Sequence, residues 1–277
     1  MSEPAILAFE RVSLSFDDQP ALRDVSFSVL KGESLVVMGA AGSGKTVLLK
    51  VALGLLRPDS GRLTLFGADV THFSEEEWFD MRAKIGVLFQ EGGLFDSLTI
   101  EENVAYPLRN QRLLQVPEDQ VLPRVEESLS FVELGHTLEK YPSELSGGMR
   151  RRVGIARAVV SNPALLLYDS PTAGLDPITA NTIMALIVKG RDLYSNTTVM
   201  ATHRYQDGQI LSSCHYDAAA TLRPAGRNGD SPRTRFLVLR DGRVVFDGPQ
   251  AELEASRDAY LRKFVRHEPP RPGAMGF

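Results

Sequence analysis

Short apolar runs alternate with longer segments of helical spacing along most of this chain. The runs of strand length, rich in β-branched and other apolar residues, predict strands at Ala5–Phe9, Val12–Phe16, Ser26–Leu30, Ser34–Met38, Arg62–Phe66, Ile85–Phe89, Ala164–Tyr168 and Thr197–Ala201. Apolar residues that recur every three or four positions predict helices at Val47–Leu55, Ile100–Leu108, Val121–Phe131, Arg150–Val160 and Thr182–Leu193. Strands that alternate with helices indicate an α/β fold with a parallel sheet and crossover connections.

The helical block in the middle of the chain predicts a subdomain inserted at about residues 92–161. We therefore expect one large domain over residues 1–250 that contains this insertion. A C-terminal helix and a Pro-rich tail are expected over residues 251–277.

The last third of the chain is less regular. The polar, Gly- and Pro-containing stretch Ser212–Arg235 predicts an irregular loop. Phe236–Asp247 predicts a hairpin that turns at Asp241-Gly242. The tail from Glu268 onward is rich in proline, and we expect it to be mobile.

Composition restricts the class of protein without naming a function. The 277 residues carry a formal net charge of −4, so the overall charge gives no indication of nucleic acid as a partner. The single cysteine, Cys214, excludes an internal disulfide and favours a reducing compartment. The first residues lack the pattern of a signal peptide, and no window of about eighteen apolar residues predicts a membrane span. Any role at a membrane is therefore expected to depend on a partner.

A phosphate-binding loop follows the predicted strand Ser34–Met38. Its G-x-x-x-x-G-K-[ST] pattern consists of Gly39, Ala40, Ala41, Gly42, Ser43, Gly44, Lys45 and Thr46. The glycines allow backbone N–H groups to face a β/γ-phosphate, Lys45 adds a positive charge, and the Thr46 hydroxyl can bind Mg²⁺. Because the loop lies between a strand and a helix, it predicts binding of a nucleoside triphosphate.

Further motifs follow this loop in a specific order. They are Gln90 at the end of a strand, Leu145-Ser146-Gly147-Gly148-Met149 before a helix, the apolar strand Leu165-Leu166-Leu167-Tyr168-Asp169, then Ala173-Gly174-Leu175-Asp176, and finally His203. With these motifs the chain resembles ATP-binding cassette (ABC) ATPases from about residue 8 to residue 248. The resemblance implies a P-loop NTPase fold with a RecA-like core, an N-terminal antiparallel β subdomain and an inserted α-helical subdomain. It also implies ATP and Mg²⁺ as cofactors.

Some of these residues have a chemistry that can be derived from their position. Asp169 ends a buried strand, where α/β sheets place ligands, and its carboxylate can hold Mg²⁺ through water. Ser146, Gly147 and Gly148 begin a helix, where a hydroxyl and bare N–H groups can bind an anion. The resemblance implies that they meet the γ-phosphate of ATP bound to a second cassette, in a homodimer or a heterodimer.

Other roles come from the resemblance alone. It assigns Gln90 to Mg²⁺ and the attacking water, His203 to the γ-phosphate, and Asp176 to the bound nucleotide. It assigns Phe16 to stacking on adenine, although core packing is an alternative for this side chain. Residues 150–152, a run of arginines, are expected to be the solvated start of a helix rather than a nucleic-acid patch.

The chain departs from the family pattern at position 170. Family members usually carry a glutamate directly after the strand-end aspartate, whereas this chain reads Asp169-Ser170-Pro171. Serine has no useful basicity near neutral pH, so it cannot replace a general base. Three interpretations remain: slow hydrolysis, which we favour; a degenerate half of a heterodimer; or substitution by a nearby carboxylate such as Glu91.

One segment points to a subfamily. Residues 87–108 read VLFQEGGLFDSLTIEENVAYPL, which is similar to the ATPases of Mla-type phospholipid transporters that work with MCE-domain proteins. This resemblance implies lipid transport, a permease partner, an MCE-type substrate-binding protein and a peripheral location on the cytoplasmic face of the inner membrane. Leu94, Phe95 and Leu98 form either a docking patch for a partner helix or part of the core.

Other classes of cassette protein fit less well. Translation factors of the family usually carry tandem cassettes, and repair proteins insert a long coiled coil, neither of which this sequence shows. An importer of another small substrate, or an ATP-binding switch that hydrolyses weakly, stays open because of Ser170.

Overall fold

The computed structural model describes residues 5–111, 113–216, 222–224 and 233–265, and its centre is a six-stranded sheet. The strand order is β12-β11-β3-β8-β7-β6, and every neighbouring pair is parallel except β11 with β12. The strands are β3 (Ser34–Gly39), β6 (Ile85–Leu88), β7 (Leu165–Asp169), β8 (Thr197–Thr202), β11 (Thr234–Arg240) and β12 (Arg243–Gly248). The predicted α/β class with parallel strands is therefore confirmed.

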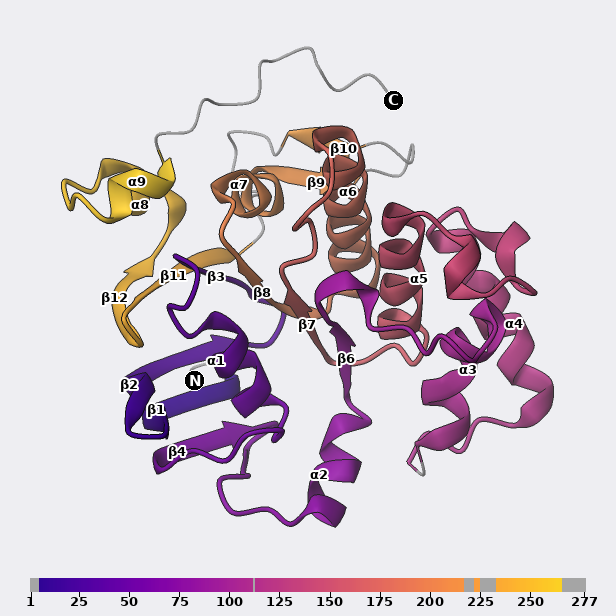
Figure 1. Ribbon diagram of the computed structural model, residues 1–277, viewed down its shortest axis with the longest axis horizontal. Coiled ribbons are helices and arrows are strands. Elements are labelled where there is room, and N and C mark those ends of the chain that lie inside the picture. The colour runs from indigo at the N-terminus through magenta and orange to yellow at the C-terminus, as the bar shows by residue number, and fades with distance from the viewer. Residues whose placement is uncertain (1–4, 112, 217–221, 225–232, 266–277) are drawn as a thin grey trace.

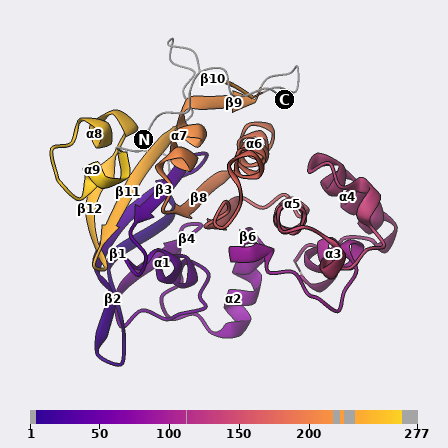
Figure 2. The same ribbon diagram turned by 45° about the horizontal axis from the view of Figure 1, so that its top comes forward.

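Alternate residues of each central strand enter two separate cores. In β3, Leu35 and Val37 pack with α1 (Lys45–Ala52) and the N-terminal strands, whereas Val36 and Met38 pack with the helices on the opposite face. Because both faces are covered, all six residues of β3 are buried. The result is a three-layer arrangement in which the sheet separates α1 and the segment with Trp78 from the helices on the opposite face (Figures 1 and 2).

The N-terminal strands form a second, antiparallel sheet with the order β2-β1-β4-β5. Its strands are β1 (Ala5–Phe16), β2 (Gln19–Leu30), β4 (Ser60–Leu65) and β5 (Ala68–Asp69). The prediction of two short strands before residue 17 was wrong, because β1 is continuous. A register shift against β2 lies between Phe9 and Val12, and Arg11 has a φ of 52°. This irregularity interrupted the alternating pattern in the sequence without breaking the strand.

The inserted block consists of three helices at the right of Figure 1. They are α3 (Ile100–Asn110), α4 (Glu118–Phe131) and α5 (Gly147–Val159), joined through the short 3-10 turns η2 (Gly135–Thr137) and η3 (Pro142–Glu144). Thr99 caps α3 through a reciprocal bond pair with Glu102, and Ser146 caps α5. The buried faces of these helices join the same core as Leu88 and Tyr168.

The hydrophobic pattern does not predict one further helix. Helix α2 (Glu75–Arg82) buries only Trp78, so its sequence lacks an apolar face of helical spacing. Ser74 and Glu77 nevertheless form a capping box at its start, and this S-x-x-E signal was available in the sequence.

The polar stretch after His203 is more regular than predicted. It begins in α7 (Tyr205–Ser213) and continues into β9 (Cys214–Tyr216), which pairs antiparallel with β10 (Leu222–Pro224). The prediction of an irregular loop over residues 212–235 was therefore wrong where these strands lie. Buried Arg191 on α6 (Pro177–Tyr194) donates from Nη2 to the Cys214 carbonyl at 2.8 Å, which joins this hairpin to α6.

The C-terminal part contains the predicted hairpin and two short helices, α8 (Gln250–Ala255) and α9 (Leu261–Val265). Asp241 and Gly242 turn the hairpin with φ of 50° and 76°, as the sequence predicted. The tail from Glu268 lies outside the described residues. Within the described part of the chain, no helix combines the length and the apolar character needed to cross a membrane.

Candidate functional site

The candidate site lies along one edge of the central sheet. Because β3, β8, β7 and β6 are parallel neighbours, the residues that follow their carboxyl ends come together. The phosphate loop follows β3, His203 follows β8, Asp169 ends β7, and Gln90 begins the turn η1 (Gln90–Gly92) after β6. Residues from four distant sequence segments are thereby brought to the same edge.

The phosphate loop has a tightly restricted backbone. Gly39, Gly42 and Gly44 have φ of 155°, 76° and 105°, which side chains disfavour. A Cβ on Gly39 would lie 2.5 Å from the Leu239 carbonyl oxygen, and one on Gly44 would lie 2.6 Å from the Ala21 carbonyl oxygen. Only glycine therefore fits between the loop and its neighbours at these two positions.

Lys45 begins α1 and turns back over the loop. Its ammonium donates to the carbonyls of Gly39 at 2.8 Å and Ala40 at 2.9 Å. Burial lowers the pKa of Lys45, and the negative charge of Asp169 opposes this change. The buried Ser43 Oγ has no hydrogen-bond partner among the described residues. A phosphate group fits here, because it would supply both a negative charge for Lys45 and an acceptor for Ser43.

Asp169 is buried beside Ser170 at the end of β7. The Ser170 hydroxyl donates to Asp169 Oδ1 at 3.2 Å, and its N–H donates to the Ala201 carbonyl at 2.8 Å. With Thr46 exposed at the start of α1, Asp169 and Thr46 would hold Mg²⁺, which would neutralise phosphate charge. The exposed side chains of Gln90 and His203 lie at the same edge. The proposed substitute Glu91 has a side chain outside what the structure describes.

Phe16 lies at the tip of the β1–β2 hairpin and is 46% exposed, so it is not a core residue. The same hairpin contacts the phosphate loop, because Ala21 borders Gly44. An exposed ring on a hairpin that contacts this loop is compatible with stacking on a base, and this role stays a prediction.

The LSGG segment (residues 145–148) and the loop before α6 both contribute residues to a second hollow, which the phosphate loop does not line. Asp176 caps α6 by accepting from the N–H groups of Ile178 and Thr179, both at 3.0 Å. The Thr179 hydroxyl also donates to Asp176, and these bonds lower the pKa of its carboxyl. A hollow of about 580 Å³ is lined by both segments, including Ser146, Gly147, Gly148 and Asp176. Ser146 and Gly147 are exposed there.

The expectation of a solvated arginine run at residues 150–152 was wrong for its middle member. Arg151 is 4% exposed and donates to the carbonyls of Ser170, Pro171 and Ala173 at 2.7–2.9 Å. It therefore fixes the LSGG helix to the loop that follows Asp169. No feature of the local sequence indicates this burial, since a run of charged residues is usually solvated.

A second connection was also missed. Asp207 on α7 is 1% exposed and accepts from the hydroxyls of Thr172 at 2.6 Å and Thr202 at 2.8 Å. Burial raises the pKa of Asp207, and the two hydrogen bonds oppose that change. This network joins the loop after β7 to the strand that precedes His203.

Replacing Arg151 by methionine is expected to lower the free energy of unfolding by about 2–4 kcal/mol. The variant keeps most of the side-chain volume but leaves three carbonyls without this donor. Urea denaturation followed by the fluorescence of Trp78, the single tryptophan, measures the change. Arg124→Met, at an exposed position on α4, is the control. A loss for Arg151→Met below about 0.5 kcal/mol would show that these bonds do not stabilise the fold.

Comparisons with known proteins agree with this architecture. The model of the family described as "ABC transporter" matches residues 22–173. A methionine import ATP-binding protein of Bifidobacterium longum is 38% identical over 273 residues, which cover 96% of this chain and 62% of that protein. A probable ribonucleotide transport ATP-binding protein of Mycobacterium tuberculosis is 39% identical, over 91% of this chain and 64% of that protein. This chain thus spans less than two thirds of the length of both relatives.

Solved structures of similar fold are cassettes as well. The dimeric, ADP- and phosphate-bound ATP-binding cassette MJ0796 superposes with a TM-score of 0.74 at 28% identity, over 87% of this chain and 97% of that one. CbiO1 of Clostridium perfringens is described as part of the transporter complex cbiONQ. It superposes with a TM-score of 0.75 at 28% identity, over 92% of each chain.

Proposed function

Because this chain belongs to the ABC transporter family, whose cassettes bind ATP with Mg²⁺ and hydrolyse it, we propose that it is the ATP-binding subunit of a transporter. In this proposal ATP binding and hydrolysis drive movement of a substrate through a partner permease. The main observation behind this proposal is that the phosphate loop, Asp169, Gln90 and His203 all lie at one edge of the central sheet.

The phosphate loop and the LSGG segment lie apart within one chain, and this separation supports a dimer. Ser146 and Gly147 are exposed in a hollow that residues 39–46 do not line. A second cassette, identical or closely related, would bring its own LSGG segment against the nucleotide held by Lys45. Closing and reopening of this pair would be the movement that the permease uses.

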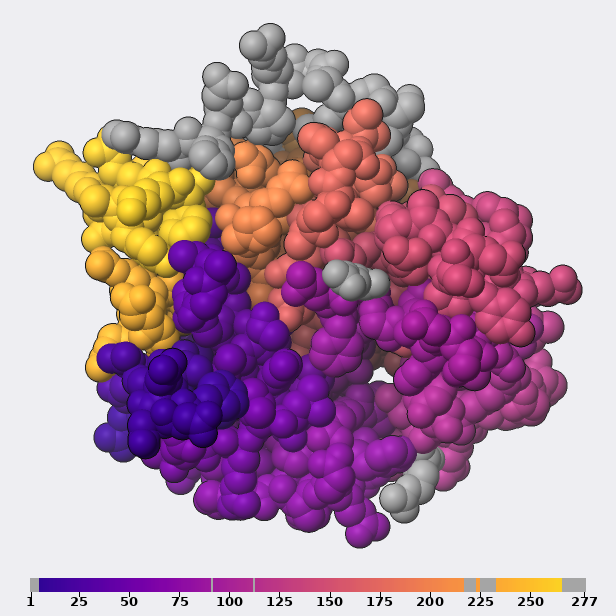
Figure 3. Space-filling model, viewed as in Figure 1, coloured from indigo at the N-terminus to yellow at the C-terminus, as the bar shows by residue number. Residues whose placement is uncertain are grey.

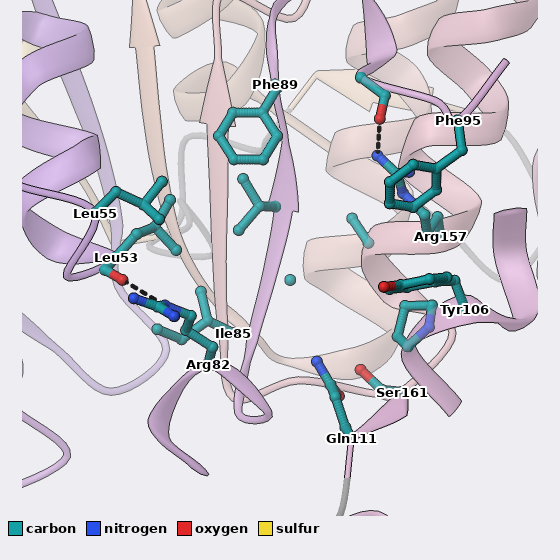
Figure 4. A pocket seen from close by; sticks show the side chains of 15 residues that line it. Leu53, Leu55, Arg82, Ile85, Phe89, Phe95, Tyr106, Gln111, Arg157 and Ser161 are labelled. Atoms are coloured by element: carbon teal, nitrogen blue, oxygen red, sulfur yellow. Dashed lines mark hydrogen bonds between the residues drawn. The ribbon is translucent and has the colours of Figure 1, made fainter. Parts of the chain in front are cut away.

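A groove between the core and the helical block is the proposed docking site for the permease. It has a volume of about 450 Å³ and is lined largely by apolar side chains, including Leu55, Phe89, Phe95 and Tyr106 (Figure 4). Phe95 is 41% exposed there and packs against Tyr106 at 4.7 Å between ring centroids. An exposed apolar groove of this kind suits an amphipathic helix.

The groove is connected to the candidate site. Arg157 lies over the Phe95 ring and donates to the carbonyls of Gly92 at 3.1 Å and Gly93 at 2.8 Å. Those glycines lie two and three residues after Gln90 in the chain. A helix that moves Phe95 would therefore act on the turn that carries Gln90. Leu94 is instead half-buried and packs against the core, so only part of the predicted patch is free for docking.

We propose phospholipid as the substrate class, with an MCE-type substrate-binding protein as a further partner and a peripheral position on the cytoplasmic face of the inner membrane. The similarity of residues 87–108 to Mla-type ATPases supports this choice. A second candidate, import of a small solute, is favoured by the methionine and ribonucleotide transport relatives.

Coexpression with a candidate permease tests the docking proposal. Phe95→Asp is expected to reduce copurification of the permease, because it places a charge in an apolar contact. Leu122→Asp, at an exposed position on α4, is the control and should copurify normally. Equal recovery of permease with both variants would exclude the groove as the docking site.

Proteoliposomes that contain the complex distinguish the substrates. ATP-dependent movement of a labelled phospholipid supports the lipid proposal. Movement of labelled methionine or ribonucleotide without phospholipid movement supports the second candidate and contradicts the first.

A further inference from the structure

The C-terminal segment, residues 250–265, packs beside β11, the neighbour of the strand β3 that leads to the phosphate loop. Leu253 on α8 and Leu261 on α9 are 1% and 4% exposed, and they join the core that contains Phe236 and Val238 of β11. In Figure 3 this segment, in yellow, lies beside the N-terminal half of the chain, in indigo and purple. Two buried leucines therefore fix its position on the domain.

Tyr260 is the residue of this segment that reaches the phosphate loop. Its hydroxyl donates to the Leu239 carbonyl at 2.9 Å and accepts from the Ala40 N–H at 3.2 Å. Leu239 is the register partner of Gly39 across β11 and β3. The hydroxyl thus bridges the two strand ends where the phosphate loop begins.

The peptide group between Gly39 and Ala40 is held from both sides. Its N–H donates to the Tyr260 hydroxyl, and its carbonyl accepts from the Lys45 ammonium at 2.8 Å. Lys45 is the residue expected to neutralise phosphate charge. A change at Tyr260 would therefore act on the same peptide group that orients Lys45.

The position of Tyr260 is itself fixed by several contacts. Asp258 accepts from the N–H groups of Tyr260 at 2.8 Å and Leu261 at 3.0 Å. The guanidinium of Arg240 lies 5.3 Å from the centre of the Tyr260 ring, and Phe264 packs edge-on at 5.2 Å. The hydroxyl is consequently held in place before any nucleotide binds, which is the requirement for a positioning residue.

We propose that Tyr260 positions the phosphate loop for nucleotide binding and couples the C-terminal segment to the nucleotide site. This inference rests on the proposed ATP-binding function. Because coupling between two sites is reciprocal, bound nucleotide in turn stabilises the C-terminal segment.

Calorimetric titration with Mg-ADP, which avoids hydrolysis, measures the effect. Tyr260→Phe keeps the ring and removes the hydroxyl, and we expect the Kd to rise by roughly 3- to 10-fold, as loss of one hydrogen bond predicts. The control is Tyr194→Phe at the end of α6, at the sheet edge opposite the phosphate loop, and it should bind like the wild type.

Two further measurements separate positioning from general stabilisation. Amide hydrogen exchange at Ala40 should become faster in Tyr260→Phe and stay unchanged in Tyr194→Phe. In the wild type, Mg-ADP should slow tryptic cleavage after Arg262 and Lys263, and this protection should weaken in Tyr260→Phe.

Wild-type affinity for Mg-ADP in a folded Tyr260→Phe protein would overturn the inference, as would equal losses in both tyrosine variants. Absence of Mg-ADP binding by the wild-type protein would be a different result, since it would contradict the proposed function itself.

Discussion

ATP turnover by a Lys45→Ala variant is expected to fall by about 10²–10³-fold or more. Lys45 is 8% exposed and lies over the loop, where its ammonium donates to the backbone carbonyls of Gly39 and Ala40. Removing one such preorganised charge commonly costs this much in rate. Release of inorganic phosphate under saturating Mg-ATP measures the effect.

The matched control is Lys50→Ala. Lys50 lies on the same helix, α1, but its side chain is exposed near the opposite end. It should hydrolyse ATP like the wild type, because it cannot reach the phosphate loop. If Lys45→Ala retains more than about half of the wild-type rate, the loop is not the site of phosphate neutralisation.

Ser170→Glu is expected to raise turnover by about 10²-fold, the lower end of what a positioned general base contributes. The residue lies next to Asp169, and its side chain already reaches the Asp169 carboxylate. A glutamate there would have its pKa raised by the neighbouring negative charge, toward the range of an effective base. Ser170 has a φ of 51°, a left-handed conformation that a non-glycine residue already adopts at this position. Glutamate would have to adopt the same backbone conformation.

Ser170→Gln separates basicity from shape. Glutamine has nearly the volume of glutamate but cannot accept a proton, so its turnover should stay at the wild-type level or below. A folded Ser170→Glu protein with wild-type or lower turnover would contradict slow hydrolysis caused by a missing base. It would favour the interpretation of an ATP-binding switch or a degenerate half of a heterodimer.

The central sheet could be predicted from the sequence because burial on both faces requires strands that are apolar at nearly every position. Strands such as Ser34–Gly39 read as continuous apolar runs between turn residues. The phosphate loop could also be recognised in the sequence, since phosphate binding requires particular residues at fixed positions. Parallel strand order then explains why Gln90, Asp169 and His203 meet, once the topology is known.

What the sequence did not reveal depends on long-range contacts. Arg151 is buried only because the carbonyls of Ser170, Pro171 and Ala173 converge on it. Tyr260 lies 220 residues after Ala40, and nothing in the local pattern of either residue indicates their contact. Helix α2 and the β9–β10 hairpin were missed because short elements with few buried residues have weak periodicity.

In the proposed mechanism, two cassettes close over ATP held by the phosphate loop. Light scattering of a Ser170→Gln protein after size-exclusion chromatography detects this closed pair, because slow hydrolysis lets it accumulate. With Mg-ATP the mass is expected to double relative to the nucleotide-free protein, and additional replacement of Lys45 by alanine should abolish the change. A mass that stays that of one chain at saturating Mg-ATP, with no nucleotide retained, would show that two cassettes do not close over ATP.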